Sequence, residues 1–328
     1  MRRVDGSQEL ARARLADGAV RPVTATAERM EAWPQWSDAA SRVAFEAAAP
    51  EAGARADLVL WDPESGRESP VAATHARDER WPAWAPGAAA LAFAFRGGEP
   101  ASGVALLDVA TGAASLAAAG GEQDFYLRPA FAPDGRVLVA QRRGPDGRGS
   151  HLWLLASGAP PHALTSEPAS FDWKPGFTRA GDRIVFSRRP IAGGPAFAAR
   201  IDAAGGEVQA IPLALAPGAD VHSARPSPTR DELAFVAERD GRAEVFLADL
   251  SGAGVRALTR GSERQAFAPR WSPDGELLVV TATPPGAPTP RLADPEGLEQ
   301  ASVVVLDRAG RVLFETPGMM ADWMPPWR

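Results

Sequence analysis

The chain has 328 residues, a formal net charge of −6 and no cysteine. An acidic balance of this size argues against a nucleic-acid surface, which needs many basic residues to contact phosphates. The absence of cysteine excludes disulfides, thiolate metal sites and a cysteine nucleophile.

No membrane span is predicted, because the sequence has no run of about 18 apolar residues. Residues 1–6 carry charge with no apolar stretch behind them, so no signal peptide can be read. A chain of this length could hold two domains, but a repeat that continues along the whole sequence favours one.

One motif recurs along the chain and marks the start of each repeat. Its clearest copy is Pro269-Arg270-Trp271-Ser272-Pro273-Asp274-Gly275, which precedes an apolar run at residues 277–280. Weaker copies begin at Pro34, Pro82, Pro129, Pro175 and Pro226, and the chain ends on Pro325-Pro326-Trp327. Consecutive copies lie between about 43 and 56 residues apart, and a period of this size indicates a propeller or a solenoid.

Each repeat reads as four short antiparallel strands, A to D, separated by Gly, Asp and Pro turns. Strand A carries the motif, strand B follows it, strand C ends near an aspartate in most repeats, and strand D closes the repeat. Strand B is expected at residues 43–45, 91–93, 137–139, 184–186, 233–236 and 277–280, and strand C at 58–62, 104–108, 151–155, 197–202, 245–249 and 303–307. These runs are continuously apolar, which suits strands covered on both faces, as in stacked blades.

The two ends of the chain are expected to share one blade. Residues 8–26 align with strands C and D of the fifth repeat, yet no strand A precedes them. Residues 323–328 would supply the missing strand A and close the ring. The fold class is therefore an all-β propeller of seven four-stranded blades, with six as the alternative, in a single domain of residues 1–328. Only residues 1–4 remain for strand B of the closing blade, so either that blade has three strands or the true start lies upstream.

This repeat resembles that of the TolB β-propeller family. The likeness rests on Pro-x-Trp-Ser-Pro-Asp-Gly before an apolar strand that ends in Phe, then an apolar strand that ends in Asp, then Gly and Leu-Thr. It covers the chain from about residue 9 to residue 327. The chain differs from TolB itself in two respects, since it has seven copies of strand A where that family has six, and no α/β domain precedes the repeats.

The resemblance implies a scaffold, because the family includes periplasmic proteins that dock partner proteins in the cell envelope. We therefore predict a non-catalytic, monomeric scaffold that binds a protein or peptide, with no nucleic acid and no membrane span. The periplasm is the implied location, with the cytoplasm as the alternative. Similar propellers precede prolyl-oligopeptidase-type hydrolase domains, so an enzyme is the alternative function: a hydrolase or lyase acting on a sugar or lactone through a channel metal or a carboxylate pair.

No catalytic motif supports the enzyme. The sequence has no Gly-x-Ser-x-Gly elbow, no His-Glu-x-x-His and no Gly-x-x-x-x-Gly-Lys. The four histidines, His75, His151, His162 and His222, lie in different repeats without the spacing of metal ligands. We predict no catalytic residue, no metal ligand and no cofactor, with Ca²⁺ in the channel as the alternative.

The candidate binding site is the channel mouth, where the loops that join D to A and B to C should surround the axis. Residues three positions before each motif proline should line it, and four of these are the carboxylates Glu31, Glu79, Asp172 and Asp322. Such a ring would focus a negative potential and attract a cation or a basic segment of a partner. The alternative is that these acids cap turns or pair with arginines such as Arg80, Arg128 and Arg225.

Aromatic residues share these segments and suit contacts with a peptide or a sugar. Packing between blades is the alternative, and we expect it for the tryptophans inside the motif, Trp36, Trp84, Trp271 and Trp327. The predicted binding residues are Glu31, Trp33, Glu79, Trp81, Tyr126, Arg128, Asp172, Trp173, His222, Arg225, Asp322 and Trp323.

The longest loop, residues 283–300, contains five prolines and is expected to project on the same face as the acids. A loop of this length in a compact domain is usually functional or disordered. We interpret it as a flap over the channel, with a disordered segment as the alternative.

Overall fold

The chain is built from strands and turns. The computed structural model describes residues 2–4, 7–26, 29–37, 39–51, 53–71, 77–87, 89–144, 147, 149–156, 158–259, 264–285 and 300–324. No helix occurs within these ranges, and hence none that is long and apolar enough to cross a membrane.

The first fourteen strands cover the N-terminal half of the chain. They are β1 (Arg2–Val4), β2 (Ser7–Glu9), β3 (Ala11–Ala13), β4 (Val20–Pro22), β5 (Met30–Ser37), β6 (Arg42–Ala48), β7 (Ala56–Trp61), β8 (Glu68–Pro70), β9 (Asp78–Trp84), β10 (Ala90–Arg96), β11 (Ser102–Asp108), β12 (Ala114–Gly120), β13 (Tyr126–Phe131) and β14 (Val137–Arg143). The remaining strands are β15 (Ser150–Ala156), β16 (His162–Ala163), β17 (Ser170–Phe177), β18 (Arg183–Pro190), β19 (Phe197–Asp202), β20 (Gln209–Ala210), β21 (Asp220–Pro226), β22 (Glu232–Arg239), β23 (Arg242–Asp249), β24 (Arg256–Ala257), β25 (Gln265–Trp271), β26 (Leu277–Thr283), β27 (Ser302–Asp307) and β28 (Val312–Pro317).

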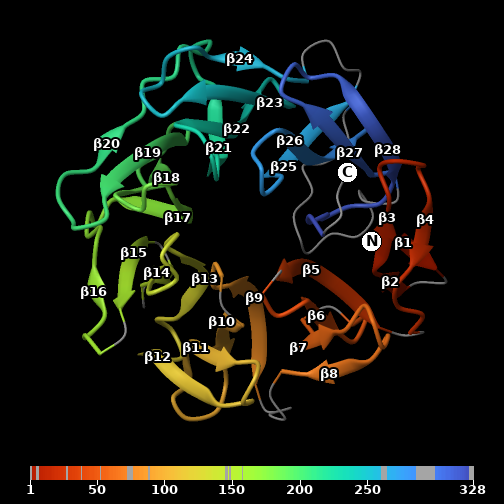
Figure 1. The fold of residues 1–328 in the computed structure, drawn as a ribbon. Coiled ribbons are helices and arrows are strands. Elements are labelled where there is room, and N and C mark those ends of the chain that lie inside the picture. Colours follow the sequence, from red (N-terminus) through yellow and green to blue (C-terminus); the bar gives the residue numbers. More distant parts are fainter. Residues whose placement is uncertain are drawn as a thin grey trace.

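These strands pair in sequence order as antiparallel groups of four: β5–β8, β9–β12, β13–β16, β17–β20, β21–β24 and β25–β28. The groups stand around a central axis like the blades of a propeller (Figure 1). The prediction of an all-β propeller of small antiparallel sheets is therefore confirmed. The predicted strands B and C also lie within the second and third strands of these groups, except that residue 62 directly follows the end of β7.

The number of hydrogen-bonded sheets differs from the predicted number of blades. The sheets contain six, four, eight, four, four and two strands, because single parallel bridges join neighbouring groups. One such bridge links Ser150 to Phe171 and the other links Gln8 to Met30. The sheets thus do not correspond one to one with seven, or with six, four-stranded blades.

Aspartates at the ends of the third strands form the turns that follow. The Oδ1 atoms of Asp62, Asp108 and Asp307 accept hydrogen bonds from backbone N–H groups two residues ahead, at 2.8, 2.9 and 2.9 Å. A short acceptor side chain in this position mimics a backbone turn. This local chemistry explains why the apolar third strand ends in Asp so often.

The core lies between neighbouring groups. Each group contributes a fully buried phenylalanine or a comparable side chain, such as Phe45, Phe95, Phe186 and Phe235. The motif tryptophans also connect groups, since Trp84 Nε1 donates to the Gln35 carbonyl at 2.9 Å and Trp271 Nε1 donates to the Arg225 carbonyl at 3.0 Å. These two side chains pack between groups, as predicted, whereas Trp327 lies outside the described residues.

The innermost strand of each group contains a β-bulge, which lies at the motif proline in every group except that of β21, where it lies at residues 223–224, just before Pro226. The pairing of β5, β9, β13, β17, β21 and β25 skips two residues, and the first of these has a positive φ. The residues concerned are Trp33 (54°), Trp81 (56°), Arg128 (49°), Lys174 (54°), Ser223 (55°) and Ala268 (51°). Proline follows in five of the six strands, and it is tolerated there because a bulged residue needs no N–H for the ladder.

The two ends of the chain lie on the same side of the ring (Figure 1). Within residues 8–26, which are predicted to form strands C and D, the first strand is divided, because Leu10 separates β2 from β3, and β3 pairs with β4. Met324 packs against the cluster that contains Leu10 and Val23. The described part of the predicted closing strand, residues 323 and 324, forms no strand, and residues 325–328 lie outside the described ranges.

The predicted flap also falls largely outside the described residues. Of residues 283–300, the structure describes only 283–285 and 300. The histidine at position 75 is outside them as well. The interpretation of this loop therefore stays a prediction.

Candidate functional site

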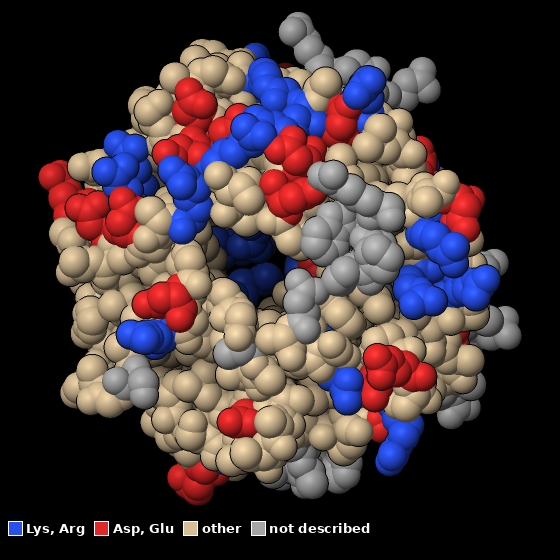
Figure 2. Space-filling model, in the orientation of Figure 1, with Lys and Arg blue, Asp and Glu red and all other residues tan. Residues whose placement is uncertain are grey.

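A channel runs along the axis of the ring, and basic side chains dominate its visible interior (Figure 2). The bulges direct side chains into it, as the contacts among three different inner strands demonstrate. The guanidinium carbon of Arg128, on β13, lies 5.7 Å from the ring centroid of Trp33 on β5 and 5.6 Å from that of Trp81 on β9. Residues on three separate groups can meet in this way only at the axis.

Four basic residues gather in the channel, and we call them the channel cations: Arg128, Lys174, Arg225 and Arg270. Lys174 and Arg128 occupy bulge positions, while Arg225 and Arg270 follow the bulges of β21 and β25 by two residues. Arg270 has a carboxylate partner, since its Nη1 lies 3.3 Å from Asp322 Oδ1. Among the described residues, the other three form no ion pair with a carboxylate.

The surroundings of the channel cations disfavour their charges. Burial lowers the pKa of Arg128 and of Arg225, and the nearby positive charge of Arg270 lowers both further. Burial also lowers the pKa of Lys174 well below its usual range, and the three arginines add to this effect. Like charges held together without counter-charges are unfavourable unless a ligand supplies them. The channel is therefore suited to an anion.

One buried acid borders the cations. Glu46, on β6, is 3% exposed, accepts a hydrogen bond from the Trp81 backbone N–H at 2.7 Å, and lies 3.3 Å from Arg80. Burial raises its pKa to about 7, against the lowering effects of these partners and of Arg128. Near neutral pH the negative charge of Glu46 therefore balances the positive charge of Arg128 only in part.

The expected ring of unpaired acids at the channel mouth is not formed. Glu31 is fully buried and accepts hydrogen bonds from the Leu10 backbone N–H at 3.0 Å and from Thr24, and it also pairs with Arg29. These contacts hold β5 to the N-terminal strands. Asp172 is also fully buried, and Arg188 donates two hydrogen bonds to it, at 2.7 and 2.8 Å.

The other two predicted acids have similar structural roles. Glu79 is 1% exposed and accepts a hydrogen bond from the Leu58 backbone N–H at 3.3 Å, across to β7. Asp322 accepts from the Trp36 backbone N–H at 3.1 Å in addition to its contact with Arg270. The alternative, in which the acids cap turns or pair with arginines, describes these residues better than the ring does. The paired arginines are Arg29, Arg188 and Arg270, and not the expected Arg80, Arg128 and Arg225.

Asp322 also occupies a different repeat position from the other acids. Met320 has a φ of 53°, like the bulge residues, and Trp323 follows it by three residues, as Trp271 follows Ala268. Trp323 Nε1 donates to the Arg270 carbonyl at 3.2 Å, which matches the bond of Trp271 to the preceding group. Trp323 is therefore a packing residue at 7% exposure.

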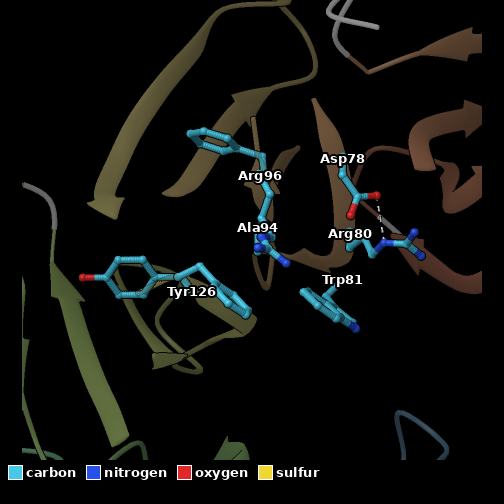
Figure 3. Close-up of a pocket in the computed structure, with 8 residues that line it drawn as sticks. Asp78, Arg80, Trp81, Ala94, Arg96 and Tyr126 are labelled. Carbon is cyan, nitrogen blue, oxygen red and sulfur yellow. Dashed lines mark hydrogen bonds and ion pairs between the residues drawn. The ribbon is translucent and has the colours of Figure 1, made fainter. Parts of the chain in front are cut away.

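A side pocket of about 290 Å³ adjoins Trp81. Residues from β9, β10 and the start of β13 line it, and they include the predicted residues Trp81 and Tyr126 (Figure 3). Arg80 is held by Asp78 at 2.9 Å, and the guanidinium of Arg96 lies 4.0 Å from the Phe125 ring centroid. The pocket thus presents aromatic rings and two guanidinium groups beside the channel.

The remaining predicted residues lie apart from this pocket. Trp173 contacts Phe171, with ring centroids 5.6 Å apart, and Arg189 at 5.9 Å. His222 precedes the bulge of β21 and lies 3.1 Å, through Nδ1, from Ser223 Oγ. Burial lowers the pKa of His222 to about 4, with a further contribution from Lys174.

Sequence reasoning missed Lys174, Arg270, Ser223 and Glu46. A sequence signal for the first of these did exist, because a proline inside an inner strand indicates a bulge, and a bulge turns the preceding side chain out of the ladder. No group of three or more His, Cys, Asp or Glu residues that could hold a metal ion occurs in the part of the chain that the structure describes.

Known structures share this fold. A prolyl endopeptidase aligns with a TM-score of 0.68 at 16% identity, over 90% of this chain and 44% of its own. TolB from Acinetobacter baumannii aligns with a TM-score of 0.58 at 20% identity, over 84% of this chain and 63% of its own. An oligogalacturonate lyase in complex with manganese aligns with a TM-score of 0.67 at 14% identity, over 95% of this chain and 84% of its own.

These similarities show the fold alone. The chain spans less than two thirds of the length of the endopeptidase and of the Acinetobacter TolB. No curated protein sequence matches it. A family model does match, that of the TolB beta propeller domain, over residues 81–309. Because this match covers more than half of the sequence, the chain belongs to the TolB β-propeller family.

Proposed function

We propose that this chain is a non-catalytic, monomeric scaffold that binds an acidic segment of a protein or peptide in its axial channel. The observation that carries the proposal is that three of the four channel cations, Arg128, Lys174 and Arg225, form no ion pair with a carboxylate among the described residues. This reverses the charge of the partner expected from sequence, because three of the acids that suggested a basic partner, Glu31, Glu79 and Asp172, are buried, and the fourth, Asp322, pairs with Arg270. The predicted residues Arg128, Arg225, Trp33 and Trp81 remain in the proposal.

The aromatic residues give the channel a second type of contact. Arg128 lies between the rings of Trp33 and Trp81, which hold its guanidinium near the axis. Aromatic and arginine side chains are the usual anchors of protein interfaces. A carboxylate of the partner would bind Arg128 or Arg225, while an apolar side chain of the same segment would enter the pocket beside Trp81.

Binding of a labelled peptide tests this function. The probe is an eight-residue peptide rich in Asp and Glu that contains one Phe, and its matched control carries Lys in place of the acids. Fluorescence anisotropy should detect binding of the acidic peptide only. The double variant R128Q/R225Q should weaken it at least tenfold, because two charge-assisted contacts are lost.

A control with the same change in net charge separates a site from general attraction. Arg179 forms an exposed ion pair with Asp231, and Arg230 forms one with Glu276. The two arginine side chains are nearly half exposed. R179Q/R230Q should leave the affinity within about twofold of the wild type, since exposed charges are screened. Equal losses in both double variants would show that the peptide has no specific site in the channel.

The ring closure belongs to the same proposal. Seven positions share the positive φ that marks an inner strand, from Trp33 to Met320. This supports seven repeats in one domain, in which residues 319–323 take the innermost place beside the N-terminal strands. The Trp36 N–H bond to Asp322 then joins the last repeat to the first. Family membership also supports a periplasmic location, which fractionation of cells expressing the native gene would test.

An enzyme acting on an acidic sugar is the second candidate. The channel cations could neutralise the carboxylates of such a substrate, and an oligogalacturonate lyase is among the proteins with this fold. Incubation with oligogalacturonate, followed by ultraviolet absorbance of the unsaturated product, separates the two. Turnover that the R128Q/R225Q variant lacks would replace the scaffold with the enzyme.

A further inference from the structure

Lys174 differs from every other basic residue of the protein. It is the only lysine in the sequence, and all the other Lys+Arg positions are arginine. It occupies the bulge of β17, where its side chain reaches the channel and stays partly exposed to it. A chain that uses arginine everywhere else thus places its one primary side-chain amine at the axis.

A short hydrogen-bonded chain holds this amine. Lys174 Nζ donates to Ser223 Oγ at 2.8 Å, on the neighbouring inner strand β21. Ser223 Oγ lies 3.1 Å from His222 Nδ1, and His222 Nε2 lies 3.8 Å from Glu238 Oε2. The amine, the hydroxyl and the imidazole form a route along which a proton can leave Nζ.

Charged side chains on three other inner strands surround Lys174. Arg128 on β13, Arg225 on β21 and Arg270 on β25 act on Lys174, and they lower its pKa in addition to burial. His222 faces Lys174 together with Asp220 and Arg189. Burial keeps the pKa of His222 low, so the imidazole is neutral near pH 7 and can relay a proton between its two nitrogens but does not retain it.

A lysine in these surroundings can do what an arginine cannot. A guanidinium stays protonated in proteins, whereas an amine that is desolvated or beside other cations loses its proton and becomes a nucleophile. The hydrogen bond to Ser223 alone would not require lysine, because arginine also donates to hydroxyls. The identity of the residue therefore points to chemistry of the free amine.

We propose that Lys174 is a reactive amine that forms an imine with a small carbonyl compound carrying a carboxylate, such as a 2-oxo acid. Arg225 and Arg128 would hold the carboxylate and leave the carbonyl carbon facing Nζ. This site goes beyond the proposed scaffold function and does not depend on it, since it needs only a small anion in the channel.

The reaction is balanced without any further reagent. The lone pair of the neutral Nζ amine attacks the carbonyl carbon, the N–C bond forms, and one Nζ proton passes to the carbonyl oxygen with Ser223 and His222 as the relay. In the resulting carbinolamine the second Nζ proton is transferred to the hydroxyl group, which leaves as water while the C=N bond forms. Amine and carbonyl compound thus yield imine and water, with no oxidation or reduction.

Reductive trapping tests the site in the intact protein. Glyoxylate, an aldehyde that carries a carboxylate, is added at pH 7 with cyanoborohydride, and labelled peptides are quantified by mass spectrometry. An ordinary lysine would react on the order of a hundredfold more slowly than the N-terminal α-amine, because far less of it is deprotonated. Lys174 should instead be labelled at least as fast as the N-terminus.

Three comparisons make the result specific. K174R should lose the label while the N-terminus keeps it. R225Q should slow labelling of Lys174 by glyoxylate at least tenfold and by acetaldehyde to a smaller extent, because loss of the Arg225 charge raises the pKa of Lys174 for both reagents, whereas only glyoxylate loses a partner for its carboxylate. R179Q, which removes an exposed arginine, should alter neither rate. Because the ratio of the two amines is measured within the wild-type protein, it is informative even if K174R fails to fold. Labelling of Lys174 slower than that of the N-terminus would overturn the proposal.

Discussion

Two sets of charged residues on the inner strands lie in opposite electrostatic environments, and on β17 their members are only two residues apart. Asp172 is fully buried and receives two hydrogen bonds from Arg188. Lys174, two residues later, faces the channel with a serine hydroxyl as its hydrogen-bond partner and with three arginines nearby. We call these the acid layer (Glu31, Glu79, Asp172) and the cation layer (the channel cations).

The contrast separates stability from function. In the acid layer, Glu31 and Glu79 accept hydrogen bonds from the preceding group of strands and Asp172 accepts them from Arg188 on β18 of its own group, so each carboxylate has its hydrogen bonds within the fold. The cation layer costs stability, because desolvated like charges lie together with little compensation. Residues that violate the rules of stable packing in this way are expected at functional sites. Substitutions in the two layers should therefore change stability in opposite directions.

The largest effect should come from Asp172. D172A leaves Arg188, which is 7% exposed, without its main counter-charge. Removing one member of a buried pair should lower the free energy of unfolding by about 3 kcal/mol or more. Urea denaturation measures the loss. D231A is the control, since its ion pair with Arg179 is exposed, and it should leave the free energy of unfolding nearly unchanged. Equal losses would show that the acid layer is not structural.

Glu46 should give a large effect that depends on pH. Its pKa is about 7 in the folded protein and 4.5 when unperturbed, so the folded state binds the proton more tightly. Stability is then highest below pH 4.5 and falls as the pH rises through 7, by up to about 3 kcal/mol. E46Q cannot ionise but can still accept from the Trp81 N–H.

The test for Glu46 compares unfolding at pH 4 and pH 8. Relative to the wild type, E46Q should gain stability between these two values, because only the wild type must ionise a buried acid. A charge-matched substitution at an exposed acid, E122Q, should show no such gain. Parallel pH profiles for E46Q and the wild type would contradict the effect of burial.

The fold was far easier to predict from sequence than the site. The motif prolines located the inner strands, and the apolar runs located the strands that follow, because both are local signals. The site depends on side-chain direction, and the bulges change that direction. Counting three residues back from each proline led to Glu31 and Asp172 in the walls, whereas the residues directly before proline, such as Arg128 and Lys174, reach the axis.

The remaining part of the site could not be read from periodicity at all. Arg225 and Arg270 lie beyond the bulges, and their proximity to Lys174 results from the closure of the ring rather than from any spacing in the chain. Likewise, Asp322 aligned with the acids only when residues 325–327 were taken as the last motif. The positive φ of Met320 and the hydrogen bond of Trp323 place that motif at Trp323 instead.

A substitution in the cation layer is expected to raise the stability moderately, whereas D172A lowers it. Arg225 has no carboxylate partner among the described residues, so R225M should raise the free energy of unfolding by about 1 to 2 kcal/mol. The backbone carbonyl that accepts from Trp271 Nε1 is unchanged by this substitution. The same variant should bind the acidic probe peptide more weakly. A destabilised R225M would place Arg225 in the fold rather than in a ligand site.

The smallest expected change in stability is at Asp322. A substitution there also discriminates best between an acidic and a basic partner. This carboxylate is the counter-charge of Arg270, and its pKa is raised by burial. D322N keeps an oxygen that can accept from the Trp36 N–H, so the stability should change by less than about 1 kcal/mol. Removing the negative charge frees Arg270, and the affinity for the acidic peptide should rise about fivefold. If acids at the mouth attracted a basic partner instead, D322N would leave the acidic peptide unbound and weaken the lysine-bearing control peptide. One titration with each peptide therefore decides which charge the channel recognises.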